Sequence, residues 1–127
     1  MGVRLIPKAM AGFVPIEVEK SKEKYDCCLL DDDSLVEMTW RMAAESKNKT
    51  MICFFNPDDF FKKATELDFE VPVYVDSNLG NGIKGEEVAK KIFEMGFKNI
   101  WLCTGYQASD FPPMAWIKGV LPKDPPF

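Results

Sequence analysis

The chain contains no histidine, no long hydrophobic run and no excess of basic residues. Without an imidazole, it cannot supply the histidine base of a Ser-His-Asp or Cys-His site. No apolar stretch approaches the roughly 20 residues that a membrane-spanning helix needs, so we expect no direct membrane contact. The formal net charge of −4 repels a phosphate backbone, so we expect no nucleic-acid partner either.

Cysteine is also scarce, and its spacing matches no zinc or redox motif. Cys27 and Cys28 are adjacent, and neighbouring residues on a strand point to opposite faces of a sheet. The pattern favours buried thiols in a reducing compartment. The first 15 residues lack the apolar core and cleavage site of a signal peptide. We therefore expect a cytoplasmic location, whether or not the parent protein is attached to a membrane.

The composition is that of one globular domain. The chain has 127 residues, of which 46% are hydrophobic and 28% charged. In the N-terminal region, Pro7, Gly12 and Pro15 interrupt any helix, and a run of charged residues follows. We expect an extension or linker at residues 1–24 and a domain at residues 25–127.

Strand and helix patterns alternate from residue 25 onward. Short apolar runs predict strands at 26–30, 50–55, 71–75, 99–103 and 117–121. Helical patterns begin at Ser34, after Asn56 and after the Gly-rich loop 77–85. Pro112 and Pro113 make any fourth helix short or irregular. This alternation is typical of an α/β fold with a parallel sheet covered on both faces.

The first predicted helix has a recognisable start and an apolar stripe. Ser34 and Glu37 have the spacing of a capping box. Leu35, Met38 and Met42 recur at helical spacing, and Val36, Trp40 and Ala43 widen this stripe. We expect this stripe to be buried. The aromatic residues around the second strand are also expected in the core, namely Phe54, Phe55, Phe60 and Phe61.

Polar residues of catalytic type follow four predicted strands: Asp31–Asp33, Asp76, Thr104 and Lys123. Parallel strands end on one side of a sheet, so these residues should converge there. Gathered carboxylates repel one another unless they are protonated or bind a hard cation, and Mg²⁺ suits them. An aspartate beside such a metal can attack a phosphoryl group, while an ammonium and a hydroxyl stabilise its charge.

These residues carry a resemblance to a known family. The stretches CLLDDDSLV, VYVDSNLGNGIKGEEVA, WLCTGY and GVLPKDPPF resemble the receiver domain of two-component response regulators. They come in the family's order and lie within residues 25–127, about four-fifths of the chain. The resemblance implies a flavodoxin-like, three-layer fold with five parallel strands in the order 2-1-3-4-5.

The resemblance also implies a function and its residues. Asp76 would accept a phosphoryl group from a phosphohistidine of a histidine kinase or a histidine phosphotransfer domain. Thr104 would be the switch hydroxyl, and Lys123 its cationic partner. Such a domain catalyses only its own phosphorylation and dephosphorylation. The implied Mg²⁺ ligands are Asp31, Asp32, Asp76 and the carbonyl of Asn78.

The sequence departs from the family pattern in three places. Asp124 follows the lysine where the family has proline, so the usual cis Lys-Pro bond is not expected. Val120 stands where the family often has an aromatic switch residue. The sequence also ends four residues after Lys123, where the family has a fifth helix. Because of these departures, the alternative remains that the domain is a degenerate receiver, which is not phosphorylated and only binds a partner protein.

Three further alternatives remain from the residues themselves. Gly2–Ala9 resembles the end of a histidine-kinase ATP-binding domain. This resemblance predicts that the domain is the C-terminal receiver of a hybrid sensor kinase in a phosphorelay. The alternative is a free-standing receiver with an N-terminal extension. Asp31 and Asp33 also fit the D-x-D motif of haloacid-dehalogenase phosphatases, as nucleophile and acid/base. That class needs an acidic pair after its lysine, which the sequence lacks. Lys118 is a rival to Lys123, which we prefer because it follows the last apolar stretch.

Overall fold

The computed structural model describes residues 21–127. Gly2–Ala9, with its resemblance to a kinase domain, lies outside the described residues, as does most of the predicted extension. The strands are β1 (Cys27–Leu30), β2 (Met51–Phe54), β3 (Val73–Asp76), β4 (Ile100–Cys103) and β5 (Gly119–Leu121). The α-helices are α1 (Ser34–Ser46), α2 (Pro57–Lys63) and α3 (Gly85–Glu94). No helix in this part of the chain is long and apolar enough to cross a membrane.

The five strands form one parallel sheet in the order β2-β1-β3-β4-β5, as predicted. The chain moves outward from β1 to β2 and then crosses back to β3 on the other side of β1. β1 and β3 are therefore parallel neighbours at the centre of the sheet. The chain adds strands toward one edge before β3 and toward the other edge after it. Ligand sites in such sheets lie beyond the carboxyl ends of the strands at this position.

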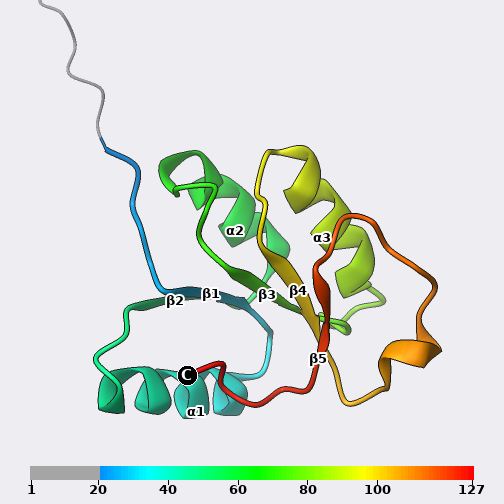
Figure 1. Ribbon diagram of the computed structural model, residues 1–127, viewed down its shortest axis with the longest axis horizontal. Helices are drawn as coiled ribbons and strands as arrows, with labels where there is room; N and C mark the ends of the chain where they lie inside the picture. Colours follow the sequence, from blue (N-terminus) through cyan, green and yellow to red (C-terminus); the bar gives the residue numbers. More distant parts are fainter. Residues whose placement is uncertain (1–20) are drawn as a thin grey trace, which may run out of the picture.

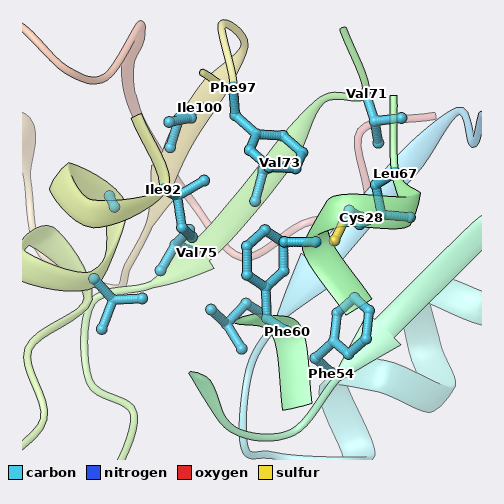
Figure 2. Packing of buried hydrophobic residues seen from close by; sticks show 14 of the residues in the cluster. Cys28, Phe54, Phe60, Leu67, Val71, Val73, Val75, Ile92, Phe97 and Ile100 are labelled. Carbon is cyan, nitrogen blue, oxygen red and sulfur yellow. The ribbon is translucent and has the colours of Figure 1, made fainter. Parts of the chain in front are cut away.

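Helices cover the sheet from both sides (Figure 1), with α1 on one face and α2 and α3 on the other. Figure 2 shows the larger core, where Phe60 of α2 and Ile92 of α3 pack beside Val73 and Val75 of β3. Cys28 belongs to this core, whereas Cys27 lies in a separate cluster with Trp40 of α1. The two adjacent thiols thus point to opposite faces, as the strand pattern predicted.

Residues 95–127, which follow α3, contain no α-helix. A single 3-10 turn, η2 (Ala108–Asp110), follows β4 where the fourth helix was expected to be short or irregular. Residues 122–127, the described part beyond β5, form no helix. Instead the C-terminal segment runs toward α1 (Figure 1), and Phe127 packs against the cluster that contains Trp40. This segment therefore lies against the same face of the sheet as α1.

The prediction of a buried stripe on α1 was right for Trp40 but wrong for the residues at its centre. Leu35 and Met42 are 62% and 61% exposed, and Met38 is exposed too. The buried face instead carries Trp40 and Ala44. The bulky indole, with its hydrogen bond to the C-terminal segment, fixes which side of the helix meets the sheet.

Two further predictions near the ends of elements were also wrong. The N-cap of α1 is Asp33, whose carboxylate accepts the Leu35 N–H at 2.9 Å, so Ser34 is the first helical residue and not the cap. Phe55 is exposed because it follows the end of β2. The start of α2 is as predicted, with Asn56 as the cap and Pro57 in the first turn.

Candidate phosphoryl-transfer site

Three carboxylates meet beyond the carboxyl ends of β1 and β3. Asp31 and Asp32 follow β1, and Asp76 is the last residue of β3. One oxygen from each lies within 4.8 Å of the others. Asp31 and Asp76 are only 1% and 2% exposed, whereas Asp32 faces solvent. The structure thus combines two buried acidic groups with one accessible group at the switch point of the sheet.

The turn after β1 explains why these groups converge. The Asp31 N–H donates to the carbonyl of Phe54, which extends the pairing between β1 and β2 by one residue. One Asp31 carboxylate oxygen then accepts the Asp33 N–H at 2.9 Å and turns the chain toward α1. Asp33 in turn caps the helix and lies outside the acidic cluster. Each of the three consecutive aspartates therefore has a different position and local role.

Lys123 provides the positive charge of the site. Its Nζ lies 3.0 Å from Oδ1 of Asp76 and 3.7 Å from Oδ2 of Asp31. All peptide bonds among residues 21–127 are trans, so the lysine reaches the site without a cis bond. Its backbone is held by the Trp40 indole, whose N–H donates to the Lys123 carbonyl at 2.9 Å. Lys118 is exposed, and its backbone N–H pairs with Ile100 at the opposite end of β4.

The electrostatics favour a bound dication. Burial raises the pKa of Asp31 to about 6, and the neighbouring Asp76 and Asp32 carboxylates add to this, against Lys123 and the Asp33 N–H. Burial by itself would lower the pKa of Lys123, but its hydrogen bond to Asp76 and the charge of Asp31 raise it overall. Three carboxylates and one ammonium leave a formal charge of −2. Oxygen ligands with this charge fit Mg²⁺.

The loop after β3 wraps around the acidic cluster. The Asn78 N–H lies 3.3 Å from an Asp76 carboxylate oxygen. Asn78 also pairs with Lys84 in a short bridge, but Ser77 and Leu79 make the backbone bonds of this bridge, so it leaves the Asn78 carbonyl free. Gly85 packs so closely that a Cβ there would lie 1.8 Å from the Asp76 carbonyl oxygen. A residue without a side chain is needed at this point.

Thr104 follows β4 and is only 2% exposed. Its Oγ1 accepts the Tyr106 N–H at 3.1 Å and forms a hydrogen bond with the Ser77 hydroxyl at 2.9 Å. Ser77 directly follows Asp76, so Thr104 is linked to the acidic cluster through one residue. A cavity of about 450 Å³ opens beside it, between residues 104–108 and 120–123.

The structure brings Asp31, Asp32, Asp76 and Lys123 into one cluster, and it places Asn78 and Thr104 on adjoining loops. Sequence reasoning missed two residues that support them, Ser77 and Trp40. The position of Ser77 next to Asp76 could have suggested a contact with the end of β4. No local signal indicates that Trp40 bonds to a backbone 83 residues away.

No family model matches the sequence, and no curated protein matches it either. Solved structures do match. The chain has the receiver fold. The response regulator TrrA from Thermotoga maritima, solved in complex with Mg²⁺ and BeF, superposes with a TM-score of 0.64 at 18% identity, over 76% of this chain and 84% of that one. The N-terminal domain of a response regulator from Carboxydothermus hydrogenoformans gives 0.62 at 14% identity, over 76% and 80%. A CheY-like receiver protein from Methanospirillum hungatei gives 0.58 at 16%, over 69% and 70%.

Proposed function

We propose that this chain is a phosphoacceptor receiver domain of two-component signal transduction. In this proposal Asp76 accepts a phosphoryl group from a phosphohistidine of a histidine kinase or a histidine phosphotransfer domain. The observation that carries the proposal is the buried Asp76 carboxylate, 3.0 Å from the Lys123 ammonium and within 4.8 Å of two further carboxylates. The receiver fold of the solved neighbours supports the same reading.

The chain supplies the nucleophile of the proposed step and two groups that can stabilise the transferred charge. A carboxylate oxygen of Asp76 attacks the phosphorus, the bond from phosphorus to the donor nitrogen breaks, and a mixed anhydride forms. The transferred group carries negative charge on its peripheral oxygens. Lys123 lies beside Asp76 and can pair with one of these oxygens. Thr104 can donate its hydroxyl hydrogen to another.

Asp31, Asp32, Asp76 and the Asn78 carbonyl would hold Mg²⁺ in this proposal. When bound, the metal supplies positive charge that neutralises the oxygens of the transferred group. The close approach and the formal charge of −2 support this assignment, as does the Mg²⁺ complex of the Thermotoga maritima neighbour. Among the three carboxylates, Asp32 is the exposed one, so it gives the cation a route from solvent.

The setting of the domain is part of the same proposal. We propose a cytoplasmic receiver that belongs to a phosphorelay, as the C-terminal module of a hybrid sensor kinase. Its partners are proteins that carry phosphohistidine, with no nucleic acid and no direct membrane contact. The resemblance of Gly2–Ala9 to the end of a kinase ATP-binding domain motivates this placement.

The two alternatives predict different behaviour. A degenerate receiver would retain the fold and bind partners without accepting phosphate. A haloacid-dehalogenase phosphatase would use Asp31 as the nucleophile and Asp33 as the acid/base. The position of Asp33 as the cap of α1, outside the carboxylate cluster, disfavours this second alternative.

Incubation with acetyl phosphate, followed by intact mass measurement, tests the proposal. We expect one added phosphoryl group in the presence of Mg²⁺ and none after Asp76→Asn. Asp33→Asn is the matched control, because asparagine caps helices as well as aspartate does. It should be labelled like the wild type. A folded wild type that gains no mass with Mg²⁺ would support the degenerate alternative.

A further inference from the structure

Ser77 makes the one side-chain hydrogen bond that joins the loop after β3 to Thr104 in the described part of the chain. The pairing follows from the register of the sheet. Asp76 pairs with Cys103, so the next residues, Ser77 and Thr104, are neighbours at the ends of adjacent strands. The Ser77 N–H also donates to the Cys103 carbonyl at 3.0 Å, which fixes its backbone against β4. The serine hydroxyl is thus placed by two strands of the sheet.

The Thr104 hydroxyl has a limited capacity for hydrogen bonds. A hydroxyl has two acceptor lone pairs and one hydrogen to donate. The Tyr106 N–H donates to one lone pair at 3.1 Å, and the Ser77 hydroxyl lies 2.9 Å from Thr104 Oγ1, where either hydroxyl can donate to the other. When Ser77 is the donor, both lone pairs of Thr104 are occupied and its hydrogen is available for a further bond.

Without a phosphoryl group, the Thr104 hydrogen can be donated to Ser77 Oγ, which lies 2.9 Å away, and Thr104 is only 2% exposed. Thr104 stands at the edge of the acidic cluster, on the strand next to Asp76. An anionic oxygen arriving at Asp76 is a stronger acceptor than the Ser77 hydroxyl, so it would take the Thr104 hydrogen and leave Ser77 as the donor to Thr104.

We propose that Ser77 is a positioning residue that fixes Thr104 as a hydrogen-bond donor toward the phosphoryl group on Asp76. When Ser77 donates to Thr104, it leaves the threonine hydrogen for the phosphoryl oxygen, and the contact restricts rotation of Thr104 about its Cα–Cβ bond. Ser77 touches neither the reacting carboxylate nor the proposed metal ligands through its hydroxyl. The inference rests on the proposed function, because it assigns Ser77 a part in that same reaction.

Four variants of the chain test this positioning role: Ser77→Ala, Ser77→Thr, Thr104→Ala and the double alanine variant. The rate of Mg²⁺-dependent labelling by acetyl phosphate and the lifetime of the phosphoprotein are measured for each. A neutral hydrogen bond of about 1 kcal/mol corresponds to roughly a fivefold change in rate, so we expect Ser77→Ala to slow labelling about fivefold.

The double variant separates positioning from a general structural effect. If Ser77 acts through Thr104, Ser77→Ala should change the rate less than twofold when Thr104 is already alanine. Ser77→Thr keeps a hydroxyl and should restore most of the wild-type rate. An equal effect of Ser77→Ala in both backgrounds, or faster labelling after Ser77→Ala, would overturn the inference.

A second measurement does not depend on phosphorylation. The three-bond couplings of the Thr104 methyl group report its side-chain rotamer by NMR in the free protein. We expect one dominant rotamer in the wild type and in Ser77→Thr, and averaging after Ser77→Ala. An unchanged rotamer after Ser77→Ala overturns the positioning role even if no labelling occurs. A labelled wild type with unchanged Ser77→Ala kinetics overturns it too, but leaves the proposed function standing.

Discussion

Replacing Asp31 by asparagine should stabilise the metal-free protein. Burial and two nearby carboxylates raise the pKa of Asp31 from 3.8 to about 6. Each pKa unit corresponds to about 1.4 kcal/mol, so ionised Asp31 costs the folded state roughly 3 kcal/mol at neutral pH. Asparagine has the same shape and keeps an oxygen that can accept the Asp33 N–H. We expect a gain of about 1–3 kcal/mol, or a melting temperature higher by about 5–15 °C.

The pH dependence of this gain gives the sharper test. Because the folded-state pKa of Asp31 is raised, the folded protein binds a proton more tightly than the unfolded chain between about pH 4 and 6. The destabilisation by Asp31 is absent below pH 4, grows up to about pH 6 and is constant above. The stability difference between Asp31→Asn and wild type should follow the same course.

Urea unfolding of both proteins in the presence of a chelator, from pH 4 to pH 8, measures this difference. Added Mg²⁺ should then stabilise the wild type, because a ligand that binds only the folded state raises its stability, and should have little effect on Asp31→Asn. An Asp31→Asn protein that is less stable than wild type at pH 7.5, or a difference independent of pH, would refute the account of this cluster.

Three further predictions concern the scaffold. Trp40→Phe removes the hydrogen bond to the Lys123 carbonyl, and it should lower the free energy of unfolding, measured by urea titration, by about 1–2 kcal/mol. It should also slow labelling by acetyl phosphate, and unchanged labelling would show that this hydrogen bond does not position the lysine. Gly85→Ala forces a Cβ into β3 and should destabilise by more than about 3 kcal/mol in a thermal melt, whereas Gly105→Ala, which meets open space, should not; equal melts would contradict the packing. Met42→Ser should change stability by less than about 0.5 kcal/mol, since the side chain is exposed, and a larger loss would mean that it is buried in solution.

Much of the fold follows from the sequence because its signals are local. Short apolar runs ending in aspartate predict the central strands, and the alternation with helices predicts a parallel sheet. The two prolines after β4 predict the loss of regular helix there. Helix rotation is different, because Leu35 and Trp40 both suit a buried face by hydrophobicity. Contact with the C-terminal segment decides between them, and no periodicity within α1 contains that information.

The candidate site divides in the same way. Asp31, Asp76 and Lys123 were placed together because parallel strands end at one edge of the sheet. The sequence does not show which of the three consecutive aspartates caps α1 and which join the acidic cluster. A turn one residue earlier or later would give these roles to different aspartates. Ser77 was missed because its partner depends on the register between β3 and β4, which the sequence does not specify.

The most direct test of the central claim is to locate the phosphoryl group after labelling with acetyl phosphate and Mg²⁺. Borohydride reduces an aspartyl phosphate to homoserine, and tandem mass spectrometry of the resulting peptides finds the modified residue. The account predicts homoserine at position 76 and at no other aspartate. Homoserine at position 31 would contradict it in favour of a phosphatase-type nucleophile. A folded protein without homoserine at any position would show that the domain acts only by binding a partner.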